Sequence, residues 1–386
     1  MRFHVTSLPH TKTSKEYCAC AYTQKVLNFC KMMMSLGHEV IHYGAEGSVV
    51  DCTEHVQIIS DAEQRQFFGD VDWHRFSFPI KWDAREPYWK LTNTRAAEEI
   101  NKRKQKKDFV CVVGGNCQKP LADGVGDDMT ITIEPFVGYY GIFSKFRAFE
   151  TYTHQSCVYG TMSSDPNGQF YDCVIPNYYD PVDFSVTHDR KDYLLYIGRL
   201  ISRKGINVVL EIAKATGRKL ILAGQGAKSI EPDHLITEEG IYIPLNDQIS
   251  YYGYAGVKER CKLMSEAHAV LMPTLFMEPF GGVAVETQFC GTPIITTDYA
   301  CFSETVKHGV TGYRCHTLEQ FKWAVENTDK LCSPNERRAI AVENYSIHSV
   351  KYMYQEWFNM LLGLWGQGWP DVSDTSRKDM SWLYKC

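Results

Sequence analysis

The chain has 386 residues, more than one hydrophobic core usually serves, so its length predicts two domains. Its composition, with 44% hydrophobic and 23% charged residues, excludes a collagen, a disordered tail protein and a coiled coil. The 41 Lys and Arg residues stand against 46 Asp and Glu residues, and the net charge of -5 excludes a protein that coats a polyanion along its whole length.

Fourteen cysteines are scattered through the chain without a regular spacing. Cys18 and Cys20 form a C-x-C pair, but no C-x-x-C occurs, so the sequence offers no zinc framework. Scattered cysteines in a large chain are typical of a reducing compartment. No run approaches the roughly 20 apolar residues of a membrane helix, and the first residues contain no apolar segment of signal-peptide length. These features predict a cytoplasmic, soluble protein.

The first half alternates apolar runs with amphipathic stretches, which is typical of a parallel sheet with helices on both faces. A strand at 2–8 is followed by a polar loop and a helix over 21–36. The further elements predicted in this half are strands at 38–44 and 55–60, a helix at 93–104, and strands at 108–115 and 129–135.

The second half repeats this alternation. It predicts strands at 192–200, 219–226, 269–274 and 293–298, and helices at 206–217, 256–266 and 281–290. Residues 175–190 between the halves are rich in Pro, Asp and Asn, a linker composition. The sequence therefore predicts an α/β protein with two Rossmann-like domains and a cleft between them. The predicted parts are a domain at 1–178, a linker at 179–190, a domain at 191–345, and an aromatic helical segment at 346–386 that packs back on the first domain.

The sharpest motif is EPFGGVAVE at 278–286, between a predicted strand and a predicted helix. Gly281 and Gly282 at the helix start leave backbone N–H groups open to an anion, and the helix dipole favours a phosphate there. Glu278 precedes this anion site, and Glu286 lies more than a turn into the helix. Two carboxylates on either side of a phosphate site suggest a nucleotide-sugar. A capping acid followed by a solvated Glu is the alternative.

A second motif, YIGRLISRKG at 196–205, places Arg199, Arg203 and Lys204 at a strand exit. Cations at this point can neutralise a diphosphate leaving group, whose charge grows in the transition state. A solvated basic turn is the alternative.

Two further stretches have open interpretations. Residues 73–90 interleave aromatic and charged side chains, which suits either stacking on a sugar or base or a lid packed on the domain. Arg147, Glu150 and His154 have the spacing of one helical face, which could face the acceptor side of the cleft or form an internal ion pair.

The second half resembles the donor domain of glycosyltransferase family 4, whose members are retaining enzymes of the GT-B fold. The resemblance covers about residues 173–320 and rests on several motifs in register. These motifs are Gly-Arg-Leu, Lys-Gly, a Gly-x-Gly at a strand exit, an acid-x7-acid motif and a later pattern of Glu and Gly. The residues that form them are Gly198, Arg199, Leu200, Lys204, Gly205, Gly224, Gln225, Gly226, Glu278, Glu286, Glu304, Gly309 and Gly312.

The resemblance implies a nucleoside-diphosphate-sugar as donor and a role for each matched position. Arg199 and Lys204 hold the diphosphate, and Glu278 contacts sugar hydroxyls. The N-terminus of the helix at 281–290 contacts the phosphates, and Glu286 contacts the ribose hydroxyls. The stretches at 224–226 and 252–255 contact the nucleobase. The residues implied in these three contacts are Gly281, Gly282, Val283, Glu286, Gly224, Gly226 and Tyr254.

The first half departs from the family. Where relatives carry glycines after the first strand, this chain has a polar loop at 9–13. His10 in this loop could bind phosphate or acceptor, with a plain surface loop as the alternative. Glu134 stands after the fifth strand, where many relatives have a His near the reacting carbon. Its carboxylate could orient an acceptor hydroxyl or be a simple loop acid.

The function that the resemblance implies is transfer of a sugar to an acceptor hydroxyl, with retention. Because Arg, Lys and a helix start carry the diphosphate charge, we expect no metal or other cofactor, although Asp70 and Asp72 form a D-x-D. The acceptor stays open between a glycan, a lipid, a metabolite and a hydroxymethylated DNA base. The basic run at 102–107 lies at the amino end of its strand, away from the cleft, which disfavours DNA. A nucleotide-sugar epimerase and a catalytically silent nucleotide-sugar-binding protein are alternatives.

Overall fold

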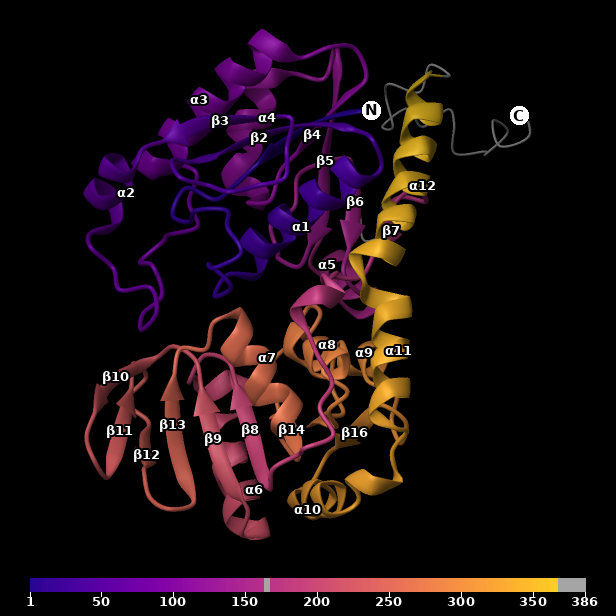
Figure 1. The fold of residues 1–386 in the computed structure, drawn as a ribbon. Coiled ribbons are helices and arrows are strands. Elements are labelled where there is room, and N and C mark those ends of the chain that lie inside the picture. The colour runs from indigo at the N-terminus through magenta and orange to yellow at the C-terminus, as the bar shows by residue number, and fades with distance from the viewer. Residues whose placement is uncertain (163–166, 367–386) are drawn as a thin grey trace.

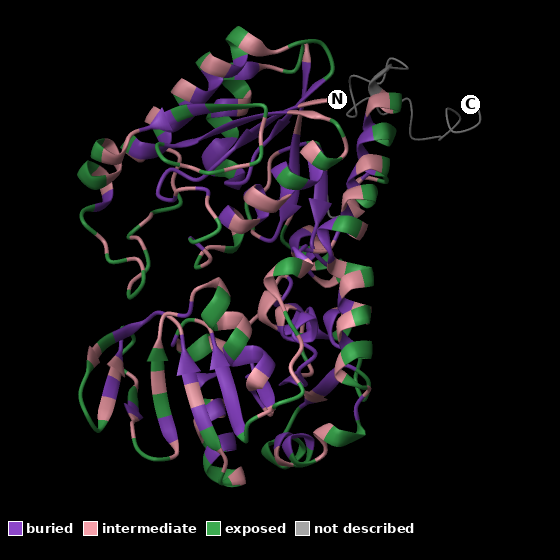
Figure 2. Ribbon diagram, in the orientation of Figure 1, coloured by how far each residue is buried: buried purple, intermediate pink, exposed green. Residues whose placement is uncertain are grey.

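The computed structural model describes residues 1–162 and 167–366. Two α/β halves lie one above the other, and the last two helices of the chain run along their side, α11 beside the second half and α12 beside the first (Figure 1). The strands of both large sheets are mostly buried, while the outer faces of the helices are exposed (Figure 2). The α/β prediction of two Rossmann-like halves is therefore confirmed.

The first half contains a parallel sheet in the order β3-β2-β1-β4-β5-β6-β7. Its strands are β1 (Arg2–Thr6), β2 (Glu39–Ala45), β3 (Glu54–Ile59), β4 (Asp108–Cys111), β5 (Thr130–Val137), β6 (Phe146–Phe149) and β7 (Cys173–Val174). Its helices are α1 (Ala21–Ser35), α2 (Asp61–Phe68), α3 (Pro87–Arg103), α4 (Lys119–Val125) and α5 (Tyr152–Thr161), with a 3₁₀ turn η1 (Gly115–Gln118).

The second half contains a parallel sheet in the order β13-β9-β8-β14-β15-β16 and a small antiparallel sheet, β10-β11-β12. The strands are β8 (Tyr193–Ile197), β9 (Lys219–Ala223), β10 (Ala227–Ile230), β11 (His234–Thr237), β12 (Tyr242–Pro244), β13 (Ile249–Gly253), β14 (Ala269–Met272), β15 (Ile294–Thr297) and β16 (Gly312–Cys315). The helices are α6 (Ile206–Thr216), α7 (Val257–Glu266), α8 (Gly282–Phe289), α9 (Phe302–Thr305), α10 (Leu318–Glu326), α11 (Pro334–Tyr345) and α12 (Ile347–Gly366), with 3₁₀ turns η2 (Pro181–Asp183), η3 (Ser202–Lys204) and η4 (Thr328–Lys330). All five residues of β8 are buried, as expected of a parallel strand covered on both faces.

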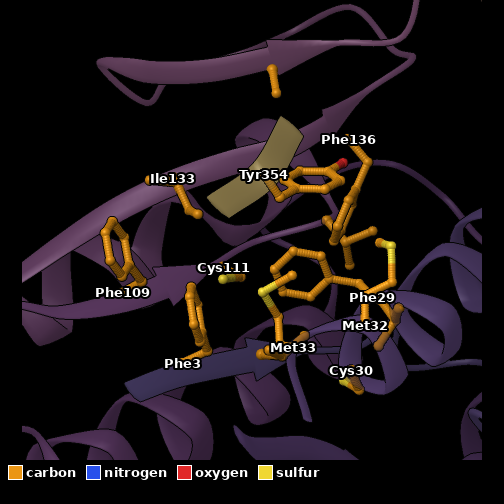
Figure 3. Packing of buried hydrophobic residues seen from close by; sticks show 14 of the residues in the cluster. Phe3, Phe29, Cys30, Met32, Met33, Phe109, Cys111, Ile133, Phe136 and Tyr354 are labelled. Atoms are coloured by element: carbon orange, nitrogen blue, oxygen red, sulfur yellow. The ribbon is translucent and has the colours of Figure 1, made fainter. Parts of the chain in front are cut away.

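The core of the first half includes side chains from the far end of the chain. Phe3 of β1 stacks on Phe109 with ring centroids 5.2 Å apart, and Phe358 of α12 lies 4.8 Å from Phe3. Tyr354, also from α12, packs edge-on against Phe29 at 5.3 Å (Figure 3). Helix α12 thus completes the hydrophobic core of the first half. The rest of the predicted C-terminal segment, residues 367–386, lies outside the described residues.

The chain passes between the two halves twice, once before β8 and once between α11 and α12 (Figure 1). The two passages are hydrogen-bonded to each other, because the Tyr179 N–H donates to the Tyr345 carbonyl and the Ile347 N–H donates to the Tyr179 carbonyl, each at 2.9 Å. Lys31 of α1 also binds the Asp180 carboxylate at 2.6 Å.

One expected helical face does not form. Arg147 lies in β6, Glu150 follows that strand, and only His154 lies in a helix, α5. The reason is that the buried run Phe146–Phe149 pairs with both β5 and β7, so the spacing of these polar residues does not reflect a helical turn.

Candidate functional site: the donor edge and the domain interface

Four loops of the second half meet at the carboxyl ends of its parallel strands. They follow β8, β9, β13 and β14, and this is the edge at which ligands bind in open α/β sheets. The same edge contacts the first half: the Thr151 hydroxyl donates to the Pro279 carbonyl at 2.8 Å, and the Gly226 N–H donates to the Arg75 carbonyl at 3.1 Å. A ligand held there would lie between the domains.

Helix α8 begins without a side-chain cap. Gly281, its N-cap residue, has φ 74°, and a Cβ there would lie 2.7 Å from a ring carbon of Phe302. A Cβ on Gly282 would lie 2.5 Å from the Tyr179 hydroxyl oxygen. Because no side chain caps the helix start, its first N–H groups are available to an anion.

The predicted diphosphate and sugar residues form an ion pair. Lys204 Nζ lies 2.5 Å from Glu278 Oε2, and both side chains are less than one-fifth exposed. Lys204 Nζ also lies 4.9 Å from the centre of the Phe276 ring, which Arg203 contacts as well. The residues come from η3 and from the loop before α8, so the pair joins two of the four loops.

Glu286 also has a cationic partner, which the sequence did not indicate. Arg260 of α7 binds its Oε2 atom. The other oxygen, Oε1, lies 3.9 Å from where a Gly282 Cβ would be, so it faces the start of its own helix. No motif marks Arg260, because its position opposite α8 depends on how α7 packs.

Arg199 is exposed at the end of β8, and its carbonyl accepts from the Tyr196 hydroxyl at 2.6 Å. Within residues 1–162 and 167–366, no carboxylate pairs with it. The loops that follow β8 and β9 are in close contact. A Cβ on Gly224, whose φ is 133°, would lie 2.1 Å from the Gly198 carbonyl oxygen. Glycine is therefore required at 224 for the strand exits to meet.

The stretch predicted to meet the nucleobase is covered by a segment of the first half, residues 69–86, here called the strap. Besides the bond from Gly226 to Arg75, the Gln225 side-chain amide donates to the carbonyls of Trp73 and Phe76, the latter at 3.3 Å. Figure 1 shows the strap descending from α2 onto the second half near β10. The lid interpretation of this aromatic segment agrees with these contacts.

Tyr254 joins the same contact. Its ring lies 5.4 Å from Trp73 and 5.1 Å from His74, edge-on to both. Its hydroxyl lies 3.0 Å from Cys18 Sγ, and burial raises the pKa of this hydroxyl well above its usual value. Two segments of the first half therefore hold Tyr254.

We expect Gln225→Ala to loosen the strap. The substitution removes two hydrogen bonds worth about 1 kcal/mol each, so cleavage by trypsin after the exposed Arg75 should be up to about thirtyfold faster. Gln155→Ala is the matched control, because the Gln155 side-chain amide donates to the Tyr159 hydroxyl, away from the strap. Equal cleavage of wild type and Gln225→Ala would show that these bonds do not hold the strap.

His10 is buried beneath the strap. The rings of Phe68, Phe78 and Trp82 stand edge-on to it at 5.7 to 6.3 Å. Burial lowers the pKa of His10 to about 3, so the ring is neutral near pH 7. The structure thus places this imidazole against the strap as an uncharged ring.

The expected position of Glu134 after its strand is wrong, because β5 continues to Val137. Its Oε1 accepts from the Tyr139 hydroxyl at 2.9 Å, and its Oε2 accepts from the N–H groups of Phe143 and Ser144 at 2.9 and 2.7 Å. Glu134 is fully buried, and burial raises its pKa to about 7. In this arrangement the carboxylate organises the loop after β5.

This raised pKa predicts a pH effect on stability. Between pH 4.5 and 7 the folded state keeps a proton that the unfolded chain releases, so the stability from protonated Glu134 is lost as pH rises through 7. Glutamine does not titrate. The free energy of unfolding of Glu134→Gln, relative to wild type, should therefore rise by up to about 3 kcal/mol between pH 4.5 and 8. Urea unfolding at the two pH values measures this, and a pH-independent difference would contradict it.

A buried ion pair in the first half faces the donor edge. Glu150 pairs with Lys25 of α1, and both side chains are less than 5% exposed. Thr151, the next residue, binds Pro279, which adjoins Glu278. Lys25 was missed because it lies within the amphipathic run of α1, where nothing in the sequence distinguishes it from a surface lysine.

A carboxylate of the second half caps a helix of the first. Glu304 Oε2 accepts from the Tyr152 N–H at 2.9 Å, and its Oε1 accepts from the N–H and hydroxyl of Thr153 at 2.8 and 2.6 Å. A carboxylate at a helix N-terminus is electrostatically favourable. Together with the strap, this cap holds the two halves in contact.

Among the described residues no group of three His, Cys, Asp or Glu side chains is arranged to hold a metal ion. The helices of residues 1–162 and 167–366 include none that is both long and apolar enough to cross a membrane.

Residues 182–345 match the family model "Glycosyl transferases group 1". The chain is 29% identical over 128 residues to an uncharacterised glycosyltransferase of Methanocaldococcus jannaschii, and the match spans 32% of each chain. The chain therefore spans about a third of the length of this curated relative.

Two solved structures extend the likeness to the whole fold. Sucrose-phosphate synthase from Thermosynechococcus elongatus is superimposable with a TM-score of 0.68 at 14% identity, over 94% of this chain and 99% of that one. HepE from Anabaena, in complex with UDP-glucose, gives 0.63 at 13% identity, over 94% and 100%. The predicted GT-B fold is thereby confirmed, and the match to the glycosyl transferases group 1 model falls within its second half.

Proposed function

We propose that this protein is a glycosyltransferase that moves a sugar from a nucleoside-diphosphate-sugar to an acceptor hydroxyl, with retention of configuration. The observation that carries the proposal is the uncapped start of α8, which lies at the same sheet edge as the pair of Lys204 and Glu278. A helix start binds phosphate, and a carboxylate beside it binds sugar hydroxyls.

The reaction makes three demands on the protein. It must stabilise the departing diphosphate, hold the anomeric carbon towards the acceptor, and keep water out. Arg199, Lys204 and the α8 N–H groups meet the first demand, and Glu278 meets the second by binding the sugar. Glu286, oriented by Arg260, takes the ribose hydroxyls. No side chain is assigned as a covalent nucleophile.

The contacts between the two domains exclude water from the site. Domain contact through the strap and through the Glu304 cap closes the cleft on the donor. The buried pair of Lys25 and Glu150 adjoins Thr151, which binds the Pro279 carbonyl next to Glu278. HepE, a protein of the same fold, is described with UDP-glucose, so UDP-sugars are the first donors to test. The acceptor stays open between the classes that the sequence allows.

The test is nucleotide release from UDP-, GDP- and ADP-sugars by wild type, Glu278→Ala and Arg199→Ala. We expect slow release from one donor in wild type and a loss of at least about a hundred-fold in both variants, because each removes a contact to the reacting groups. Glu231→Ala and Arg65→Ala, at exposed positions, are the matched controls. Neither release nor calorimetric binding of any donor by wild type would overturn the proposal. Binding without release would favour a nucleotide-sugar-binding protein.

A further inference from the structure

A cavity of about 270 Å³ lies at the edge of the second sheet opposite the donor edge. It adjoins the segments that lead into β8 and β15, at the amino ends of these strands, and the start of α11. The polar and charged side chains that line it include Arg190, His268, Thr328, Asp329, Ser333 and Arg337. The donor edge lies at the carboxyl ends of the same strands, so the cavity is separate from it.

Two guanidinium groups of this cavity converge on one carbonyl. The Gly291 carbonyl oxygen accepts from Arg337 Nε at 3.1 Å and also from Arg190 Nη2. Within the described parts of the chain, neither arginine forms an ion pair with a carboxylate. Two like charges therefore approach each other with a neutral acceptor between them.

Arg337 is only 3% exposed, and its Nη1 atom has no hydrogen-bond partner among the described residues. Burial, together with the nearby charge of Arg190, lowers the pKa of Arg337 to about 10. The negative end of the α8 dipole, just before Gly291, compensates part of this charge. It does not provide an acceptor for Nη1, and an uncompensated buried cation is costly.

The other walls suit an anion with several oxygens. Ser333 is the N-cap of α11, so the start of this helix adjoins the cavity, where the Glu336 carboxylate accepts from the Ser333 N–H at 2.8 Å. Thr328 adds a hydroxyl, whose Oγ1 lies 3.3 Å from His268 Nε2, and that nitrogen also bonds the Val325 carbonyl at 2.7 Å. Asp329 is the one carboxylate among the cavity residues named above, and it is exposed to solvent.

We propose that this cavity binds a small soluble phosphate monoester, whose phosphate group takes Arg190 and Arg337 as its ligands. Guanidinium groups match the geometry of phosphate oxygens and bind them in pairs. The cavity exceeds the volume of a phosphate ion, so it leaves room for a small organic group. It is separated from the donor edge by the length of α8, eight residues or about 12 Å.

The test is calorimetric titration with inorganic phosphate at constant ionic strength. We expect saturable binding by wild type that is at least about tenfold weaker in Arg190→Gln and Arg337→Gln. Arg190→Gln is the decisive variant if Arg337→Gln fails to fold, because Arg190 is only partly buried. Arg218→Gln, whose guanidinium is paired with Asp192 nearby, is the matched control. Lys204→Met should leave this binding intact, since Lys204 belongs to the donor edge.

Three results would overturn the proposal. The first is absence of phosphate binding by wild type, and the second is binding that survives Arg190→Gln but is lost in Lys204→Met, which would place the ion at the donor edge. The third is binding to vesicles of phosphatidylcholine and phosphatidic acid without binding of soluble phosphate or a hexose phosphate. Because none of these measurements uses a nucleotide-sugar, their outcome is independent of the proposed transfer activity.

Discussion

Lys204→Met is expected to lower the rate of donor turnover by about 10²- to 10³-fold. Methionine preserves the apolar stem beside Phe276 and removes only the charge that would balance the departing diphosphate. The loss should appear mainly in kcat, because the diphosphate gains charge in the transition state. Nucleotide release measured over a range of donor concentrations separates kcat from KM. Lys214→Met, at an exposed position of α6, is the matched control.

This substitution also leaves Glu278 without its partner, which could itself reduce activity. Comparison of the double variant Lys204→Met/Glu278→Gln with Glu278→Gln alone distinguishes the two causes, because both lack the Glu278 charge and its contact with the sugar. If the missing cation is the cause, the double variant is slower than Glu278→Gln. Equal rates in these two variants would instead mean that Lys204 serves chiefly to neutralise Glu278.

Gly282→Ala is expected to weaken donor binding by at least about tenfold. Its Cβ would lie 2.5 Å from the Tyr179 hydroxyl oxygen, and the Tyr179 ring is held by Phe184 and Phe289 at about 6 Å. Relief of such a contact costs about 1–3 kcal/mol and would displace the start of α8, where the phosphates are proposed to bind.

Tyr179→Phe supplies the matching rescue, because it removes the oxygen that the new methyl group would contact. The double variant Gly282→Ala/Tyr179→Phe should regain most of the lost affinity in a calorimetric titration with the donor. Unchanged affinity in Gly282→Ala, or an equal loss in the double variant, would show that the contact with Tyr179 does not position the α8 start.

The sequence was most informative where structure depends on neighbouring residues. The apolar run of β8 is a local signal, and the structure has a strand there as predicted. The glycines at the strand exits were indicated by the family resemblance, and their close approach appears only in the structure. Glu134 was misplaced because β5 is longer than expected and continues to Val137. Pro135 lacks an N–H, and the ladder with β6 is irregular between Glu134 and Val137, yet the strand continues beyond it.

Contacts between distant segments could not be predicted in the same way. Arg260 reaches Glu286 only because the fold brings together residues 26 positions apart in the sequence, and Glu304 reaches α5 only because the two halves meet. Neither residue has a local pattern that indicates its partner. For the candidate site, the sequence therefore indicated most of the residues at the donor edge, but not the groups that neutralise or cover them.

The double passage of the chain between its halves has a consequence for limited proteolysis. Cleavage in the exposed linker at 188–189 would break only one passage. The C-terminal fragment would still carry α12, whose Tyr354 and Phe358 are buried in the core of the first half. The two fragments should therefore co-elute after cleavage, and separation would require denaturant. A chain that ends before Ile347 would instead lose a wall of its N-terminal core and expose Phe3, Phe29 and Phe109.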